Sequence, residues 1–213
     1  MDDQELFMTN KTDKAIDIAG KSLTFHTTND FLVKRAQDIL TSEPETIAWL
    51  NMMSNNDVLW DIGANVGTYS IYASVIKDIQ VLAFEPEASN FYILNKNIRL
   101  NHCQDLVTAF PIAIGTQHRF TKLFLAKELD GWACNSVGEN IDPYLKPRKN
   151  SIEQGSICFG VDEIAAKLSS VPAHIKVDID GLELEVIKSA LQTIQSKQVK
   201  SVLIELNQNI DEH

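Results

Sequence analysis

The stretch VLWDIGANVGTYS, residues 58–70, decides the fold of this chain, because an apolar run leads directly into a turn of small residues. The pattern predicts a buried strand, a tight turn and the start of a helix, the unit with which α/β proteins hold adenosine-bearing ligands. Gly63 and Gly67 have no Cβ, so we expect the backbone there to turn sharply and to approach a ligand closely. Asp61 lies near the end of the strand, at the edge where open α/β sheets bind their ligands.

A second apolar strand is predicted in VLAFEP, residues 81–86, and it ends in the carboxylate of Glu85. Glu85 follows Gly63 by 22 residues, close to the ~20 residues expected for an acid that binds ribose hydroxyls. The sequence therefore predicts that both residues hold the same nucleoside.

The spacing of the turn indicates which adenosine ligand to expect. The pattern is G-x-x-x-G with Asn65 in its centre, so the G-x-G-x-x-G sequence of dinucleotide-binding proteins is absent. A pyrophosphate prefers bare backbone N–H groups without a carboxylate nearby, whereas Asp61 suits a cationic amino-acid tail. We therefore predict S-adenosyl-L-methionine as the cofactor.

A third stretch, HIKVDIDGLELE at residues 174–185, predicts a strand with acidic residues at its carboxyl end. Lys176, Asp178 and Asp180 share one face of an extended chain, whereas a central parallel strand is normally apolar on both faces. We predict these three as the catalytic residues, with Asp178 as the general base or as the group that orients the acceptor hydroxyl. A purely structural Lys176–Asp178 pair is the alternative.

With these three blocks in order, the chain resembles the FkbM-type methyltransferases, a branch of the class I S-adenosylmethionine-dependent enzymes. The resemblance covers roughly residues 42–207. Two departures are present: Asp180 stands where the family usually has Glu, and Asn207 stands where a His is expected after Glu205. The matching blocks are residues 61–67, 83–86 and 175–181, with weaker matches at 42–45, 113–115 and 135–137.

The resemblance implies a Rossmann-like class I methyltransferase fold, with a mostly parallel sheet and helices on both faces. It also implies O-methylation of a hydroxyl on a sugar, a lipid-linked sugar or a secondary metabolite, so a small-molecule or glycan acceptor. We expect a hairpin and helical extension over residues 1–54 and the cofactor-binding domain over residues 55–213. The cofactor residues that we predict are Asp61, Gly63, Asn65, Gly67, Glu85, Pro86 and Ala113.

Three alternatives stay open at this point. An NAD-dependent oxidoreductase or a catalytically inactive methyltransferase-like binding module would use the same strand-turn-helix unit. A divalent metal would find oxygen ligands in Asp178, Glu205 and Asn207, although we expect structural use of these side chains and predict no metal. Because the fold would continue past Leu206 with a helix and an antiparallel strand pair, we expect that this pair is lacking.

Composition excludes several classes of partner. The net charge of −10 argues against a nucleic acid or an anionic membrane surface. No apolar run approaches the ~18 residues of a membrane span, and the acidic start of the chain does not match a signal peptide. Three cysteines indicate a reducing compartment, so we predict a cytoplasmic protein. The sequence predicts no oligomeric state.

The remaining pattern predicts the connecting elements. Alternating apolar residues on either side of residues 20–21 predict a hairpin. One edge strand is expected over residues 106–114 and one helix over residues 182–195. Residues 127–156 are polar and contain Gly and Pro, which predicts a long flap over the acceptor site, with Trp132 and Tyr144 as substrate contacts.

Overall fold

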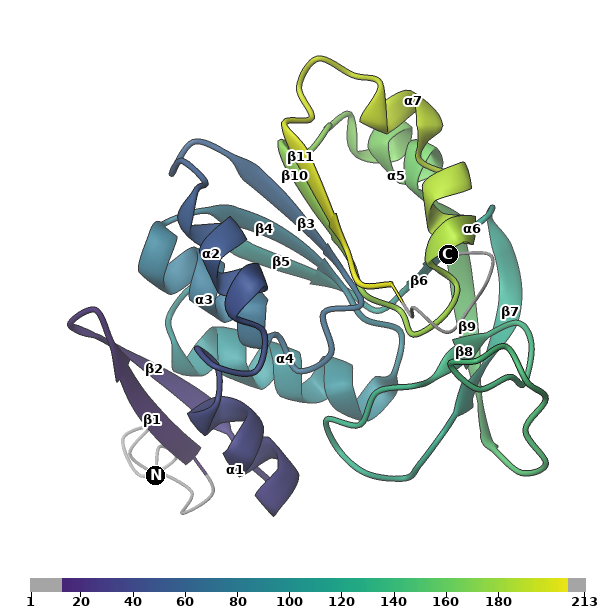
Figure 1. The fold of residues 1–213 in the computed structure, drawn as a ribbon, viewed down its shortest axis with the longest axis horizontal. Coiled ribbons are helices and arrows are strands. Elements are labelled where there is room, and N and C mark those ends of the chain that lie inside the picture. Colours follow the sequence, from purple (N-terminus) through teal and green to yellow (C-terminus); the bar gives the residue numbers. More distant parts are fainter. Residues whose placement is uncertain (1–12, 207–213) are drawn as a thin grey trace, which may run out of the picture.

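The centre of the molecule is a five-stranded sheet in which every neighbouring pair of strands is parallel. The computed structural model describes residues 13–206 of the chain (Figure 1). The strand order matches the expected Rossmann-like arrangement, with the first glycine-turn strand in the middle of the sheet. In spatial order the strands are β11 (Ser201–Ile204), β10 (His174–Val177), β3 (Val58–Ile62), β4 (Gln80–Phe84) and β5 (Val107–Phe110).

Helices cover both faces of this sheet, which confirms the predicted α/β class (Figure 1). One face packs against α2 (Pro44–Asn51), α3 (Thr68–Lys77) and α4 (Ala88–Leu100), and the other against α5 (Val161–Leu168), α6 (Glu183–Lys188) and α7 (Leu191–Ile194). Leu59 and Trp60 of β3 are both buried and belong to the two opposite clusters. The apolar run of β3 therefore fills both sides of the sheet, as a central parallel strand requires.

The predicted hairpin is present as β1 (Asp13–Ile18) and β2 (Lys21–His26), and α1 (Asp30–Gln37) follows it. Ala19 and Gly20 both have positive φ, the conformation of a two-residue turn that matches strand twist. The hairpin is fixed to α4 by its backbone: His26 donates its N–H to Asn97, 2.7 Å away. Because buried hairpin residues share a cluster with β3 and α3, the N-terminal segment packs on the central sheet. The division into domains at residues 54 and 55 stays a prediction.

The prediction of one edge strand over residues 106–114 is wrong, because this segment forms two strands that belong to different sheets. Pro111 has no N–H to donate, and the chain leaves β5 there and enters a second sheet. This four-stranded sheet has the order β6 (Ala113–Gly115), β9 (Ile152–Gly160), β7 (Arg119–Leu125) and β8 (Ser136–Val137). Since β9 begins at Ile152 and β8 lies within the expected flap, the irregular region is shorter than the sequence indicated.

The expected helix over residues 182–195 is divided into α6 and α7 by Ser189 and Ala190. Ser189 ends α6 and accepts the N–H of Val161 on its hydroxyl, while its carbonyl accepts the N–H of Asp162. The break therefore serves to anchor the start of α5, which helical periodicity does not reveal.

In the described part of the chain, β11 forms one edge of the central sheet. Residues 207–213 lie outside the described residues, so the expectations about Asn207 and about a missing strand pair stay predictions. No helix within residues 13–206 is long and apolar enough to cross a membrane.

Candidate functional site

A cavity of about 190 Å³ opens where β3, β4, β10 and β11 end. This edge of a parallel sheet is where the sequence predicted the ligand. Five of the seven predicted cofactor residues line the cavity, and two, Asp61 and Gly67, do not. The five that line it are Gly63, Asn65, Glu85, Pro86 and Ala113.

Glu85 is held at the base of this cavity with both carboxylate oxygens already oriented. One oxygen accepts the N–H of Asn65 and the other accepts the N–H of Glu87, each over 2.8 Å. Burial raises the pKa of Glu85 to about 8, although these two backbone N–H groups favour the charged form. Each oxygen retains a further lone pair, so the side chain can accept two hydroxyl groups of a diol.

The two glycines of the turn lie close to other parts of the protein. A Cβ on Gly63 would lie 1.8 Å from the carbonyl oxygen of Asp178, and φ at Gly63 is +84°. A Cβ on Gly67 would lie 2.3 Å from Leu94. Both glycines therefore make close approaches to the protein itself, and close approach of their backbone to a ligand stays a prediction.

Asp61 is buried, with 1% of its surface exposed, and accepts a hydrogen bond from the Ser70 hydroxyl over 2.5 Å. Burial raises its pKa, while the nearby Lys176 ammonium acts in the opposite direction. Its second oxygen, Oδ1, has no hydrogen-bond partner among the described residues. Direct contact between Asp61 and the cofactor ammonium stays a prediction, since the side chain is absent from the cavity lining.

The predicted catalytic residues divide into one buried and two cavity-lining side chains. Lys176 is 3% exposed, and its ammonium donates a hydrogen bond to Asp178 over 2.5 Å. Burial lowers the pKa of Lys176, but the charges of Asp178, Asp61 and Glu43 outweigh it and raise the pKa overall. Lys176 is therefore a charged support beneath Asp178, and it is Asp178 and Asp180 that reach the cavity.

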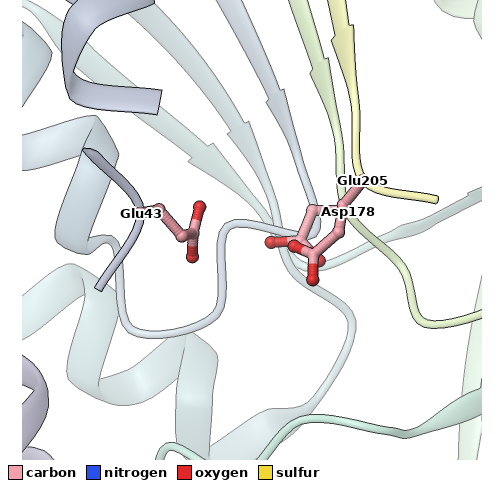
Figure 2. Close-up of side chains that lie close together, drawn as sticks. All are labelled: Glu43, Asp178 and Glu205. Atoms are coloured by element: carbon pink, nitrogen blue, oxygen red, sulfur yellow. The ribbon is translucent and has the colours of Figure 1, made fainter. Parts of the chain in front are cut away.

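Two further carboxylates, from Glu43 and Glu205, join Asp178 at this point. Figure 2 shows Asp178 and Glu205 after adjacent strands, with Glu43 opposite them on the segment before α2. One oxygen from each carboxylate lies within 4.8 Å of the other two. The Asp178 charge and, next, burial raise the pKa of Glu205 to about 7, and a hydrogen bond joins the two side chains.

These carboxylates can accept a proton, and oxygen donors of this kind can also hold a divalent cation. The sequence had indicated Glu205 at a strand end, whereas Glu43 was visible only in the weak match at residues 42–45. The third oxygen donor considered from the sequence, Asn207, lies outside the described residues.

The start of the flap forms one wall of the cavity and is fastened to α4. The Asn90 side chain accepts the N–H of Gly131 over 2.8 Å and donates to the Trp132 carbonyl over 3.1 Å. The Asn65 amide donates to the same carbonyl over 3.2 Å. Nothing in the sequence pattern identified Asn90, because a polar residue within a helix usually faces solvent.

The two aromatic residues predicted in the flap have different positions. Trp132 lines the cavity and its ring lies 5.4 Å from that of Phe31. Tyr144 is 53% exposed and is not part of the cavity lining. Asp180 accepts the N–H of Cys134 over 2.5 Å, so its carboxylate holds the flap.

Part of the cavity lining is apolar. It comes from β4, the segment around β6, and β7, so the second sheet completes the pocket that the central sheet begins. Burial of such surface contributes roughly 25 cal/mol per Å² to the binding of an apolar group. The residues concerned are Phe84, Ile112, Ile114 and Leu123.

Two curated proteins are similar to this chain in sequence. Hexuronic acid methyltransferase AglP of Haloferax volcanii is 24% identical over 200 residues, covering 92% of this chain and 74% of that protein. Methyltransferase sdnD of Sordaria araneosa is 27% identical over 158 residues, covering 64% of this chain and 61% of that protein. The chain thus spans less than two thirds of the second relative.

Solved structures are similar over parts of the chain. A precorrin 8w decarboxylase from Methanobacterium thermoautotrophicum has a TM-score of 0.44 at 15% identity and covers 76% of this chain and 61% of its own. An RNA methyltransferase from Salinibacter ruber, in complex with S-adenosyl-L-homocysteine, has a TM-score of 0.32 at 23% identity and covers 34% and 49%.

The methyltransferase FkbM domain is the family model that matches, and it covers residues 61–213, from the glycine turn to the last residue. The match includes Glu85, Asp178 and Glu205, three of the acids that line the cavity. The chain belongs to the FkbM methyltransferase family.

Proposed function

We propose that this protein transfers a methyl group from S-adenosyl-L-methionine to a hydroxyl oxygen of a sugar, a lipid-linked sugar or a secondary metabolite. The observation that carries the proposal is a single cavity lined by Glu85 at the end of β4 and by Asp178 and Glu205 at the ends of β10 and β11. Family membership and relatives named as a hexuronic acid methyltransferase and as methyltransferase sdnD support it.

The cofactor would lie along the cavity with its adenine against the apolar part of the lining and its ribose hydroxyls on Glu85. The methionine end then lies toward Asn65 and Asp178, near the carboxyl ends of the central strands. Trp132 closes this arrangement from the flap side. The methyl donor supplies an electrophilic carbon on a sulfonium, so the protein has to align the acceptor and remove one proton.

Asp178 and Glu205 are suited to the proton-transfer part of the reaction. The acceptor oxygen forms a bond to the methyl carbon, the carbon–sulfur bond breaks toward sulfur, and the hydroxyl proton passes to this carboxylate pair. Lys176 donates a hydrogen bond to Asp178 and fixes its position. The Asp178 charge and burial raise the pKa of Glu205 to about 7, so a base that is effective in the neutral range lies beside Asp178.

The test uses the purified protein with methyl-labelled cofactor and fractionated cell extracts, followed by mass spectrometry of the labelled product. We expect label in a hydroxyl-bearing compound. Glu85→Ala should weaken cofactor binding at least ~10-fold in calorimetry, since each charge-assisted hydrogen bond lost costs ~1.5–3 kcal/mol. A folded wild-type protein without saturable cofactor binding would refute the proposal.

A further inference from the structure

A second cavity, of about 290 Å³, adjoins the cofactor cavity between α1 and the first turn of α3. The two share Arg35 and Glu43 in their linings, so these side chains stand at the junction. Phe31 and Tyr69 supply aromatic walls, and Lys34 adds a second cation. None of the strand-end acids and none of the predicted cofactor residues line this second cavity.

Arg35 is a cation without an acidic partner. No carboxylate forms an ion pair with it among residues 13–206, where six ion pairs involve other side chains. Its guanidinium lies over the Phe31 ring, 5.3 Å from the centroid, which fixes the planar group without using its N–H donors. Among the described residues, Arg35 is the one cationic side chain that lines the cofactor cavity.

Glu43, which lines both cavities, is engaged elsewhere, and Asp38 is the other acid that lines the second cavity. Glu43 accepts a hydrogen bond from the Tyr69 hydroxyl and from the Thr46 hydroxyl, the latter over 2.9 Å. Among residues 13–206 no hydrogen bond joins the Arg35 guanidinium to a protein acceptor, so its five N–H donors are available to a ligand in the cavities that it lines. A guanidinium held in this way is matched by the two oxygens of a carboxylate.

We propose that Arg35 forms a carboxylate-binding subsite at the junction of the two cavities. This inference rests on the proposed function, because the carboxylate has to belong to one of the two reactants. One source is the amino-acid tail of the cofactor, which needs a cation that Asp61 and Asp178 cannot supply. The other is an acidic acceptor, such as a uronic acid, that occupies the cavity between α1 and α3.

The experiment compares three proteins, Arg35→Met, Arg35→Lys and wild type, each checked for folding by its melting temperature. Met keeps the contact with Phe31 but removes the charge, and Lys restores the charge without the planar pair of donors. Arg99→Gln is the matched control, since Arg99 is an exposed arginine on α4 that lines neither cavity.

Two pairs of probes distinguish the sources in calorimetry. S-adenosyl-L-homocysteine carries the carboxylate and 5′-methylthioadenosine lacks the whole tail, so their comparison tests the cofactor. Methyl glucuronoside and methyl glucoside, added to the protein saturated with S-adenosyl-L-homocysteine, differ in their carboxylate and test the acceptor. We expect Arg35→Met to weaken one carboxylate-bearing probe at least ~10-fold while its uncharged partner is unaffected, with partial recovery in Arg35→Lys.

Equal binding of all four probes by wild type and Arg35→Met would overturn the subsite. Equal losses for the charged and uncharged member of each pair would overturn it too, because they would indicate a structural role. Absence of 5′-methylthioadenosine binding by the wild-type protein would instead contradict the proposed function, so the two failures are distinguishable.

Discussion

Binding of the cofactor ribose should release a proton from Glu85. The pKa of this carboxyl is about 8 in the free protein, so roughly nine-tenths of it is protonated at pH 7. The ribose diol donates hydrogen bonds, which favour the charged carboxylate with its free lone pairs. Below pH 8, affinity should therefore rise by roughly tenfold per pH unit, or ~1.4 kcal/mol, and it should level off above pH 8.

The assay is titration calorimetry with 5′-methylthioadenosine, which lacks the α-amino group that would itself titrate near pH 8. Measured in buffers with different ionisation enthalpies at pH 7, the heat should report release of ~0.9 proton. Glu85→Gln should abolish this release. Glu205→Gln is the control, because the pKa of Glu205 is also raised, to about 7, but its carboxylate lies beside Glu43 and Asp178. Buffer-independent heat with affinity constant from pH 6 to 9 would refute the reasoning.

Three further predictions concern stability and turnover. Gly63→Ala should lower the melting temperature of the ligand-free protein, measured by calorimetry, because its Cβ would meet the Asp178 carbonyl oxygen at 1.8 Å; an unchanged melting temperature would contradict the role given to this contact. Folding raises the pKa of Glu85, so this side chain contributes fully to the free energy of unfolding below about pH 4.5, and the contribution is lost as pH rises through about 8. Urea unfolding of the ligand-free protein should therefore show a free energy of unfolding that falls between these two pH values. The fall should be smaller in Glu85→Gln. Asp178→Asn should lower methyl incorporation ~10²–10⁴-fold with unchanged 5′-methylthioadenosine affinity; loss of stability alone, matched by Lys176→Met, would leave Asp178 a structural role.

The sequence predicted the parts of the fold that local patterns determine. The apolar runs of β3, β4 and β10 are long enough to read as buried strands, and the strand-end carboxylates follow from the direction of parallel strands. Glu85 was predicted from its distance to Gly63, and the structure brings both to one cavity. The hairpin that turns at residues 19–20 was likewise predicted from a short stretch of neighbouring residues.

Other features depend on contacts between distant segments, which spacing does not encode. Whether Gly63 faces a ligand or the Asp178 carbonyl depends on how β10 lies against β3. Pro111 marked an interruption, but it did not indicate that the chain changes sheets there. Arg35 and Asn90 are polar residues within helices, and their orientation toward the cavity depends on how those helices pack.

The position of β10 beside β3 also has a consequence for synthesis of the chain. β10 begins 112 residues after β3 ends, while β4 follows β3 closely. On the ribosome, β3 can pair with β4 at once, but its other edge stays without a partner until residues 174–177 have emerged. Glu85 at the end of β4 is thus synthesised long before Asp178 and Glu205, so the cavity receives its strand-end acids in two separate stages.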